Sequence, residues 1–429
     1  MSTPKTPKTL LVFCDGTAQD GSTSDPNAGA PGARGQEATN VLRLAHSVLP
    51  YDKSGNRQIV FYQSGVGSES DFDGKQMSTN LVSQALGTAV ASKIRDAYVF
   101  LAQNFEEGDD ICLFGFSRGA YTARKLSGLI DAIGLLSRQN LTFFFEVWRA
   151  LNDGDTPPTF PDTRFPTMKL VGVWDTVGSV FNQVDTLNIK DTSLPATVQV
   201  AIHAISLHEN RQRFLPTLWT IPSGGLKPDQ VLKQVWFAGA HSDVGGGYDR
   251  HELSDITLFW MAGEILDLVN LDLDFLRGWA QVRPDPWGTS QPHNAFVETN
   301  IALQPIIGHE TRLEGGQLTP DAVFHQSVQF SPQKLDSPLF MTIMSNVQKH
   351  FGSAFQVQYA PLNSFEQSCK NDWGSGQLGD GHHGIETPDV MFLPKAILAG
   401  MQKARDTVEA LPVVGGVLKT LGTIGKPTF

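Results

Sequence analysis

One pentapeptide limits what this chain can fold into. Gly115-Phe116-Ser117-Arg118-Gly119 follows the apolar run 111–114 directly, and a segment of helical character, 120–126, comes straight after it. A serine between two glycines at such a junction is typical of a nucleophile elbow, a sharp strand-to-helix turn with a strained serine. Both glycines are needed because the chain passes close to its neighbours there. The sequence therefore predicts a serine hydroxyl lifted out of the end of a buried strand.

Strand-like and helix-like segments alternate through the first 270 residues. Apolar runs predict strands at 9–14, 58–63, 111–114, 168–174 and 234–238, with a shorter one at 215–221. Helical spacing predicts helices at 39–49, 81–102 and 196–211. Strands separated by helices imply an α/β fold with a mostly parallel central sheet and helices on both faces.

Polar residues stand just past the ends of these predicted strands. Asp15, Ser117, Asp175 and His241 each follow a different apolar run. The carboxyl ends of parallel strands meet at one edge of a sheet, which is where open α/β sheets bind ligands. We therefore expect the four side chains to belong to one site.

The order of these residues is typical of a serine hydrolase. On an α/β scaffold the nucleophile is followed by an acid and then by a histidine, which gives Ser117, Asp175 and His241 as catalytic candidates. The glycines at 245–247 leave room beside the serine, and Asp243 is an alternative acid. Structural roles stay open: Asp175 could cap a turn, and His241 could be hydrogen-bonded only for structure. Later histidines that follow no clear strand are weaker rivals for the base: His325, His382 and His383.

An acyl-transfer site also needs donors for the oxyanion. The first is the backbone N–H of the residue after the nucleophile, Arg118, and the second comes from the loop after an earlier strand. Gly16 and Thr17 occupy that loop, although Gly16 could be only a turn glycine. The Arg118 side chain could pair with Asp15 or with a substrate phosphate.

Two other classes of function remain open at this stage. Asp15, Asp175, His241 and Asp243 are also plausible metal ligands, so a metal-dependent hydrolase could use them and leave Ser117 incidental. No HxxxH or HxH spacing links them, however. The chain could also be a non-catalytic protein that keeps a hydrolase-like scaffold.

Composition and charge bear on the partners and the location of the chain. The 429 residues carry a net charge of −11, which argues against nucleic acid as the main partner. Cys14 and Cys112 lie in apolar runs and are expected to be buried thiols. The sequence begins without the apolar core of a signal peptide and contains no transmembrane-length apolar stretch. A cytoplasmic location is the default expectation, with export that needs no signal peptide left open.

The sequence pattern weakens beyond residue 281. We expect a catalytic domain at 7–335 and a C-terminal extension at 336–429, which forms an irregular cap or extension. Its apolar tail, from 396, is expected to dock on the body; self-association and contact with a membrane surface are alternatives. Either the loop 19–36 or the region after 281 could form a lid.

Four blocks of sequence together resemble a known family. They are FCDGT (13–17), GFSRGAYTAR (115–124), VWDTVGS (173–179) and HSDVGGGY (241–248). In this order they resemble the catalytic domain of type VI secretion phospholipase effectors and their uncharacterised relatives, over about residues 7–270. The resemblance implies an α/β-hydrolase fold, a Ser117–Asp175–His241 triad that needs no cofactor, and, in the effectors, phospholipase A activity on membrane lipids. It also makes an ester or lipid substrate and peripheral contact with a membrane reasonable expectations.

Overall fold

The computed structural model describes residues 6–17, 19, 37–66, 82–178, 192–332 and 342–379. The loop 20–36 and the tail 380–429 lie outside the described residues, so neither the predicted lid loop nor the predicted docking of the tail is tested. In the part of the chain that is described, no helix is both long and apolar enough to cross a membrane.

The described residues form one eight-stranded sheet in which every neighbouring pair of strands is parallel. Its strands are β1 (Lys8–Cys14), β2 (Arg57–Gln63), β3 (Asp110–Phe116), β4 (Met168–Trp174), β5 (Val198–Ser206), β6 (Val231–Phe237), β7 (Val323–His325) and β8 (Gln358–Ala360). The spatial order is β2-β1-β3-β4-β5-β6-β7-β8. The strand that leads into the elbow, β3, therefore lies inside the sheet between β1 and β4.

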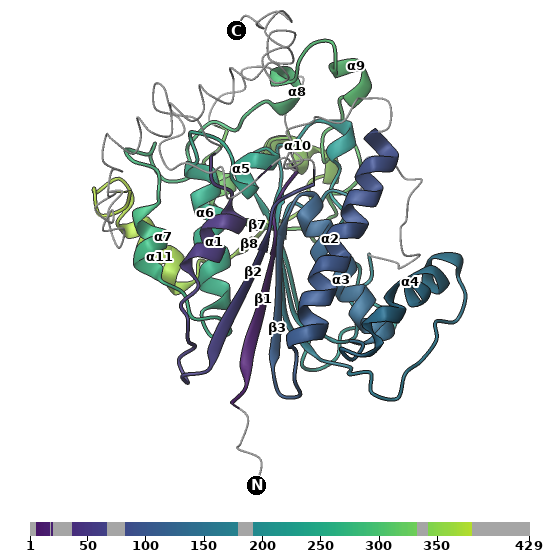
Figure 1. Cartoon of the computed structure of the whole chain (residues 1–429). Helices are drawn as coiled ribbons and strands as arrows, with labels where there is room; N and C mark the ends of the chain where they lie inside the picture. Colours follow the sequence, from purple (N-terminus) through teal and green to yellow (C-terminus); the bar gives the residue numbers. More distant parts are fainter. Residues whose placement is uncertain are drawn as a thin grey trace, which may run out of the picture. The chain divides into compact units, whose positions relative to one another are not determined.

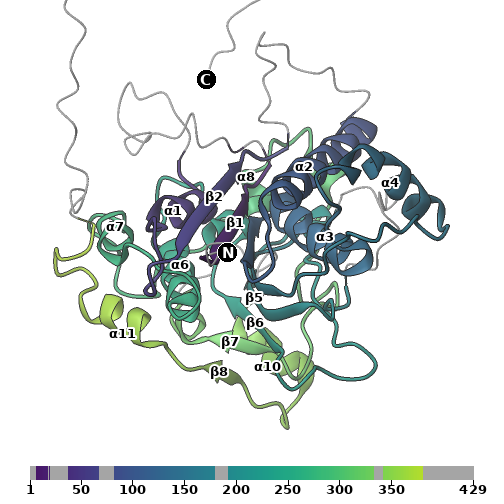
Figure 2. The ribbon, with the colours of Figure 1, turned by 60° about the horizontal axis from the view of Figure 1, so that its bottom comes forward.

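Helices cover both faces of this sheet, as Figures 1 and 2 show. On one face lie α1 (Asn40–Ser47), α6 (Glu252–Ile265), α7 (Leu273–Gly278) and α11 (Ser364–Asn371). On the other face lie α2 (Val82–Asn104), α3 (Arg118–Ile133) and α4 (Phe144–Asp153). The remaining α-helices of the described residues are α5 (His241–Gly245), α8 (Ala295–Glu298), α9 (Gln304–Ile307) and α10 (Met344–Phe351). The expected fold class, an α/β-hydrolase with a parallel sheet between helical layers, is confirmed.

Strand β1 shows why the sheet can be covered on both sides. Leu10 and Val12 pack toward α2 and α3, whereas Leu11 and Phe13 pack toward α1 and α6. Alternate side chains of a strand point to opposite faces, so a strand between two helical layers must be apolar throughout. The Phe13 ring also stacks on Phe114 of β3 at 4.7 Å between ring centres.

The predicted helix at 196–211 is wrong. The segment forms β5, which lies between β4 and β6 and is buried over most of its length. A strand buried on both faces loses the polar alternation that identifies strands, so its apolar residues also match helical spacing. The short strand predicted at 215–221 is also not formed; that segment makes only isolated bridges, Val177 to Pro216 and Ser193 to Thr220.

The described residues after 335 continue the sheet and its core. Strand β8 pairs with β7, and Asn363 and Glu366 form a capping box at the start of α11. The side chain of Asn363 also donates to the carbonyl of Trp260 in α6 at 3.1 Å. The proposed division at 335/336 stays a prediction, but no break separates β7 from β8 in the described sheet.

Candidate active site

The turn after β3 has the strained geometry that its sequence indicates. Ser117 has φ 58° and ψ −124°, a conformation that side-chain-bearing residues rarely adopt, and it caps the amino end of α3. A Cβ on Gly115 would lie 2.4 Å from the carbonyl oxygen of Gly119. A Cβ on Gly119 would lie 2.1 Å from the carbonyl oxygen of Cys14. Both glycines are therefore required by close backbone approach, one within the turn and one against β1.

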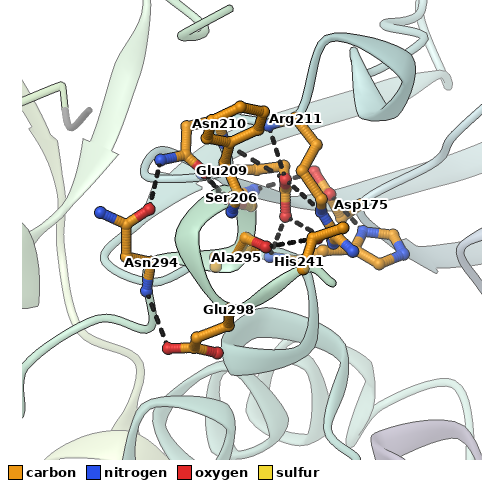
Figure 3. A network of polar contacts seen from close by, with 12 residues as sticks. Asp175, Ser206, Glu209, Asn210, Arg211, His241, Asn294, Ala295 and Glu298 are labelled. Carbon is orange, nitrogen blue, oxygen red and sulfur yellow. Dashed lines mark hydrogen bonds and ion pairs between the residues drawn. The ribbon is translucent and has the colours of Figure 1, made fainter. Parts of the chain in front are cut away.

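The structure brings Ser117, His241 and Asp175 together in a line of hydrogen bonds. The Oγ of Ser117 lies 2.8 Å from His241 Nε2, and His241 Nδ1 lies 2.6 Å from Asp175 Oδ2. The three residues follow β3, β6 and β4, so the parallel sheet delivers them to one edge. Figure 3 shows Asp175 beside His241. This arrangement can move a proton from the serine hydroxyl to the imidazole while the carboxylate orients the ring.

Asp175 is fully buried and has three donors. Its Oδ1 accepts from the backbone N–H of Ser206 at 3.0 Å, and its Oδ2 accepts from Arg312 Nη2 at 2.9 Å as well as from His241. Burial alone would raise the pKa of Asp175, but the Arg312 charge and the His241 hydrogen bond outweigh it and hold the pKa below its usual range. The carboxylate is therefore ionised where its role would require it.

A second buried carboxylate, Glu209, holds the backbone of the histidine. Its Oε2 accepts from the His241 N–H at 3.1 Å and from Arg211 Nη2 at 2.8 Å, and its Oε1 accepts from Arg211 Nε at 2.7 Å. Burial opposes ionisation, but the paired Arg211 lowers the pKa of Glu209. Figure 3 shows Glu209 and Arg211 against Asp175 and His241. Sequence reasoning missed Glu209, Arg211 and Arg312.

Aromatic rings fix the imidazole from two sides. The His241 ring lies 4.6 Å from Phe116 and 5.3 Å from Phe214, measured between ring centres. Phe116 needs space: a Cβ on Gly16 or on Gly245 would come within 2.6 Å or 2.0 Å of its ring. Gly245 was expected to leave room beside the serine, but in the structure it leaves room for the Phe116 ring.

The structure gives Asp243 a different partner from His241. Its Oδ1 lies 2.6 Å from Nδ1 of His293, and its Oδ2 accepts from the backbone N–H groups of Ala240 and His293. Asp243, the alternative acid, thus stabilises the loop at the start of α5. Among the rival histidines, His325 is buried between Ser327 and Glu366, while 382 and 383 lie outside the described residues.

The candidate oxyanion donors differ in how they are occupied. The Gly16 N–H donates to Asp15 Oδ1 at 2.7 Å, so it is already paired. The buried hydroxyl of Thr17 has no hydrogen-bond partner among the described residues. Arg118 begins α3, where backbone N–H groups are available to an anion. Burial lowers the pKa of the Arg118 guanidinium to about 10, and none of the described acids forms an ion pair with it.

The metal-site alternative finds no support in the side-chain arrangement. The Asp15 carboxylate accepts from the hydroxyls of Thr39, at 2.8 Å, and Tyr62, at 2.6 Å, whereas Asp175 is bound to His241 and Arg312. Within the described ranges, no group of three or more His, Cys, Asp or Glu residues could hold a metal ion.

Comparison with known proteins identifies the family. Residues 8–264 match the model of the type VI secretion system phospholipase effector Tle1-like catalytic domain. The chain belongs to this family. The resemblance carried by the four sequence blocks is thereby confirmed, and all residues of the Ser117–His241–Asp175 line lie within the matched part of the Tle1-like chain.

Individual relatives of this Tle1-like chain are distant. The uncharacterised protein YEL023C of Saccharomyces cerevisiae is 31% identical over 215 residues, which span 43% of this chain and 30% of that protein. A solved Tle1 effector bound to the VgrG spike is 18% identical, with a TM-score of 0.34, and the match covers 58% of this chain and 52% of the effector chain. An uncharacterised Pseudomonas aeruginosa protein has the same identity and TM-score, and the match covers 61% of this chain and 46% of that protein. Zea mays acyl-protein thioesterase 2 is 10% identical, with a TM-score of 0.26, and the match covers 62% of this chain and 97% of the thioesterase.

Proposed function

We propose that this chain hydrolyses acyl esters of lipids with Ser117 as nucleophile, His241 as general base and acid, and Asp175 as the orienting carboxylate. The observation that carries the proposal is the unbroken pair of hydrogen bonds, 2.8 Å from Ser117 to His241 and 2.6 Å from His241 to Asp175. The strained elbow supports it because it directs the Ser117 hydroxyl toward His241 at the carboxyl edge of the sheet. Membership of a phospholipase effector family supports a phospholipid as the ester.

The reaction would follow the acyl-enzyme route. His241 Nε2 takes the hydroxyl proton of Ser117 as the serine oxygen attacks the ester carbonyl, which becomes an oxyanion. Collapse of this intermediate breaks the bond to the alcohol, which receives the proton from Nε2 and leaves. Water then attacks the acyl-enzyme carbonyl while His241 Nε2 takes its proton. The acid is released, and the Ser117 oxygen receives the proton back from Nε2. The Arg118 N–H and the unpaired Thr17 hydroxyl are the donors that we assign to the oxyanion.

An apolar surface near the site would meet the lipid. Exposed apolar side chains gather in the segment that carries α8 and α9: Val297, Ile301, Leu303 and Ile306. Phe296 and Ile306 of this segment hydrogen-bond through their backbones to Asn210 and Arg213, which neighbour Glu209 in the chain. Such a cluster favours the boundary of a bilayer over water. We therefore propose peripheral membrane contact through this surface, termed the α8–α9 surface below.

Labelling with a fluorophosphonate tests the activated serine. We expect the purified chain to react at one residue, Ser117, and to cleave fatty-acyl esters of phosphatidylcholine vesicles. Ser117→Ala should abolish labelling and lower turnover by at least about 10³-fold with the fold retained. Ser327→Ala is the matched control because Ser327 also lies 2.8 Å from a histidine nitrogen but is buried away from this line.

The alternatives give different results in the same assay. Turnover that survives in Ser117→Ala and is lost under chelation would overturn the serine mechanism in favour of a metal-dependent one. A folded chain with neither labelling nor turnover would be a scaffold.

A further inference from the structure

We infer that Arg312 is a positioning residue of the proposed reaction, which holds Asp175 ionised and aimed at His241. The inference rests on the proposed function. Arg312 lies after residue 264, where the match to the family model ends, so the family comparison assigns it no role.

The contact itself is direct and fully buried. Arg312 is 0% exposed, as is Asp175, and its Nη2 donates to Asp175 Oδ2 at 2.9 Å. The same oxygen accepts from His241 Nδ1 at 2.6 Å. Asp175 Oδ2 is thus shared between a permanent cation and the imidazole. An unpaired buried charge is strongly unfavourable, so each partner depends on the other for its burial.

The turn that carries Arg312 is built to keep it there. Thr311 donates to the Glu314 carboxylate through both its backbone N–H and its hydroxyl, each at 2.9 Å. The turn is joined to the segment after β5 because Glu310 N–H donates to the Asn210 carbonyl at 3.1 Å. The guanidinium therefore reaches Asp175 from a separate, anchored part of the chain.

The charges around His241 balance only when Arg312 is counted. The charged groups that face it are Asp175 after β4, Glu209 and Arg211 after β5, and Arg312. His203 on β5 stays neutral because burial lowers its pKa to about 3. Two carboxylates thus meet two guanidinium groups around His241. Without Arg312, the local charge would be −1, which favours a protonated imidazole that cannot accept the proton of Ser117.

The geometry also indicates which substitution would preserve the role. Arg312 Nε and Nη1 have no hydrogen-bond partner among the described residues, so one of its nitrogens makes the contact with Asp175. A lysine ammonium could supply one such contact and the same charge. Glutamine could supply a hydrogen bond without the charge. The Arg312→Lys and Arg312→Gln variants therefore separate electrostatic positioning from packing.

The test is the pH dependence of kcat/KM on a soluble short-chain ester, with fluorophosphonate labelling rates measured in parallel. We expect Arg312→Gln to lower kcat/KM about tenfold or more at neutral pH and to move its acid limb upward by about one pH unit. Arg312→Lys should keep the wild-type acid limb. Arg43→Gln is the matched control, because Arg43 forms an equally buried pair with Asp255 at 2.7 Å but does not contact the site.

Each outcome decides whether Arg312 positions Asp175 for the reaction or only stabilises the fold. An Arg312→Gln profile that falls in parallel at every pH, as expected for Arg43→Gln, would overturn the inference. Should Arg312→Gln fail to fold, Arg312→Lys decides: a retained acid limb supports the inference, and a shifted one in folded protein overturns it. A wild-type chain that is neither labelled nor active would instead overturn the proposed function.

Discussion

Single residues at the site are distinguished by their partners more than by their types. Asp175 and Asp243 are both buried acids near the carboxyl end of the sheet, and sequence alone could not choose between them. In the structure Asp175 binds His241 and Arg312, whereas Asp243 binds His293 and a loop amide. The first contact orients the proposed base, and the second shapes the loop that carries it.

Two amide substitutions test this separation of roles. We expect Asp175→Asn to lower kcat about 10³- to 10⁴-fold because the amide would favour the wrong tautomer of His241. Asp243→Asn should keep kcat within about tenfold and lower the melting temperature, because it weakens a buried contact with His293. Steady-state turnover and thermal unfolding of both variants provide the measurements. Greater loss of turnover in Asp243→Asn than in a folded Asp175→Asn would reverse the assignment.

At the scale of elements, the site depends on how closely loops approach the elbow. Gly119 faces the carbonyl oxygens of Cys14 and Asp15, so α3 begins in backbone contact with the end of β1. Gly16 and Gly245 leave space for the Phe116 ring, which in turn packs on His241. The segments after β1 and β6 are thereby fitted around Phe116, the second residue of the pentapeptide.

Substitution of one of these glycines should be costly. Gly119→Ala places a methyl group against the β1 backbone, and we expect it to destabilise the fold by on the order of 3 kcal/mol or more. Gly224→Ala is the control, since a Cβ there meets nothing within 4 Å. Chemical denaturation of the two variants would check this. Equal stability of Gly119→Ala and wild type would mean that the turn can move away from β1.

Local signals predicted most of the candidate site, and its other residues are placed there by long-range contacts. The elbow, Asp175 and His241 follow apolar runs, so strand ends and chain order were enough to find them. Glu209 and Arg211 were missed because the apolar segment before them was interpreted as a helix instead of β5. Placed at the end of a strand, their polar run would have been a signal. No sequence signal pointed to Arg312, because it lies in a turn and is 137 residues from Asp175 in the chain.

At the scale of the whole molecule, the proposed membrane contact of the α8–α9 surface predicts a difference between attack on lipid aggregates and attack on dissolved esters. Ile301 is 81% exposed and Ile306 is 60% exposed. Figure 1 shows α8 and α9 beyond α5, the helix that begins at His241. A substrate in a bilayer would meet these side chains, whereas a soluble ester would not need them.

The Ile301→Asp/Ile306→Asp double variant tests the surface. We expect at least about a tenfold loss of turnover on phosphatidylcholine vesicles, because charges at this surface oppose burial in the interface. Turnover of a short-chain soluble ester should stay within about twofold. Phe165→Asp is the control: Phe165 is 66% exposed and precedes β4, toward the opposite, amino-terminal edge of the sheet. Parallel losses on both substrates would assign the surface to folding instead.

The distance along the chain between Asp175 and Arg312 has a consequence for synthesis. A growing polypeptide that has emerged through His241 already holds every member of the hydrogen-bonded line, but the cation that balances Asp175 is still to be translated. The charge of Asp175 is therefore balanced only after the segment between β6 and β7, which contains Arg312, has been translated. A ribosome-bound chain that ends before Arg312 would carry the hydrogen-bonded line without this cation, so we expect any ester cleavage by it to be slower than that of the full chain.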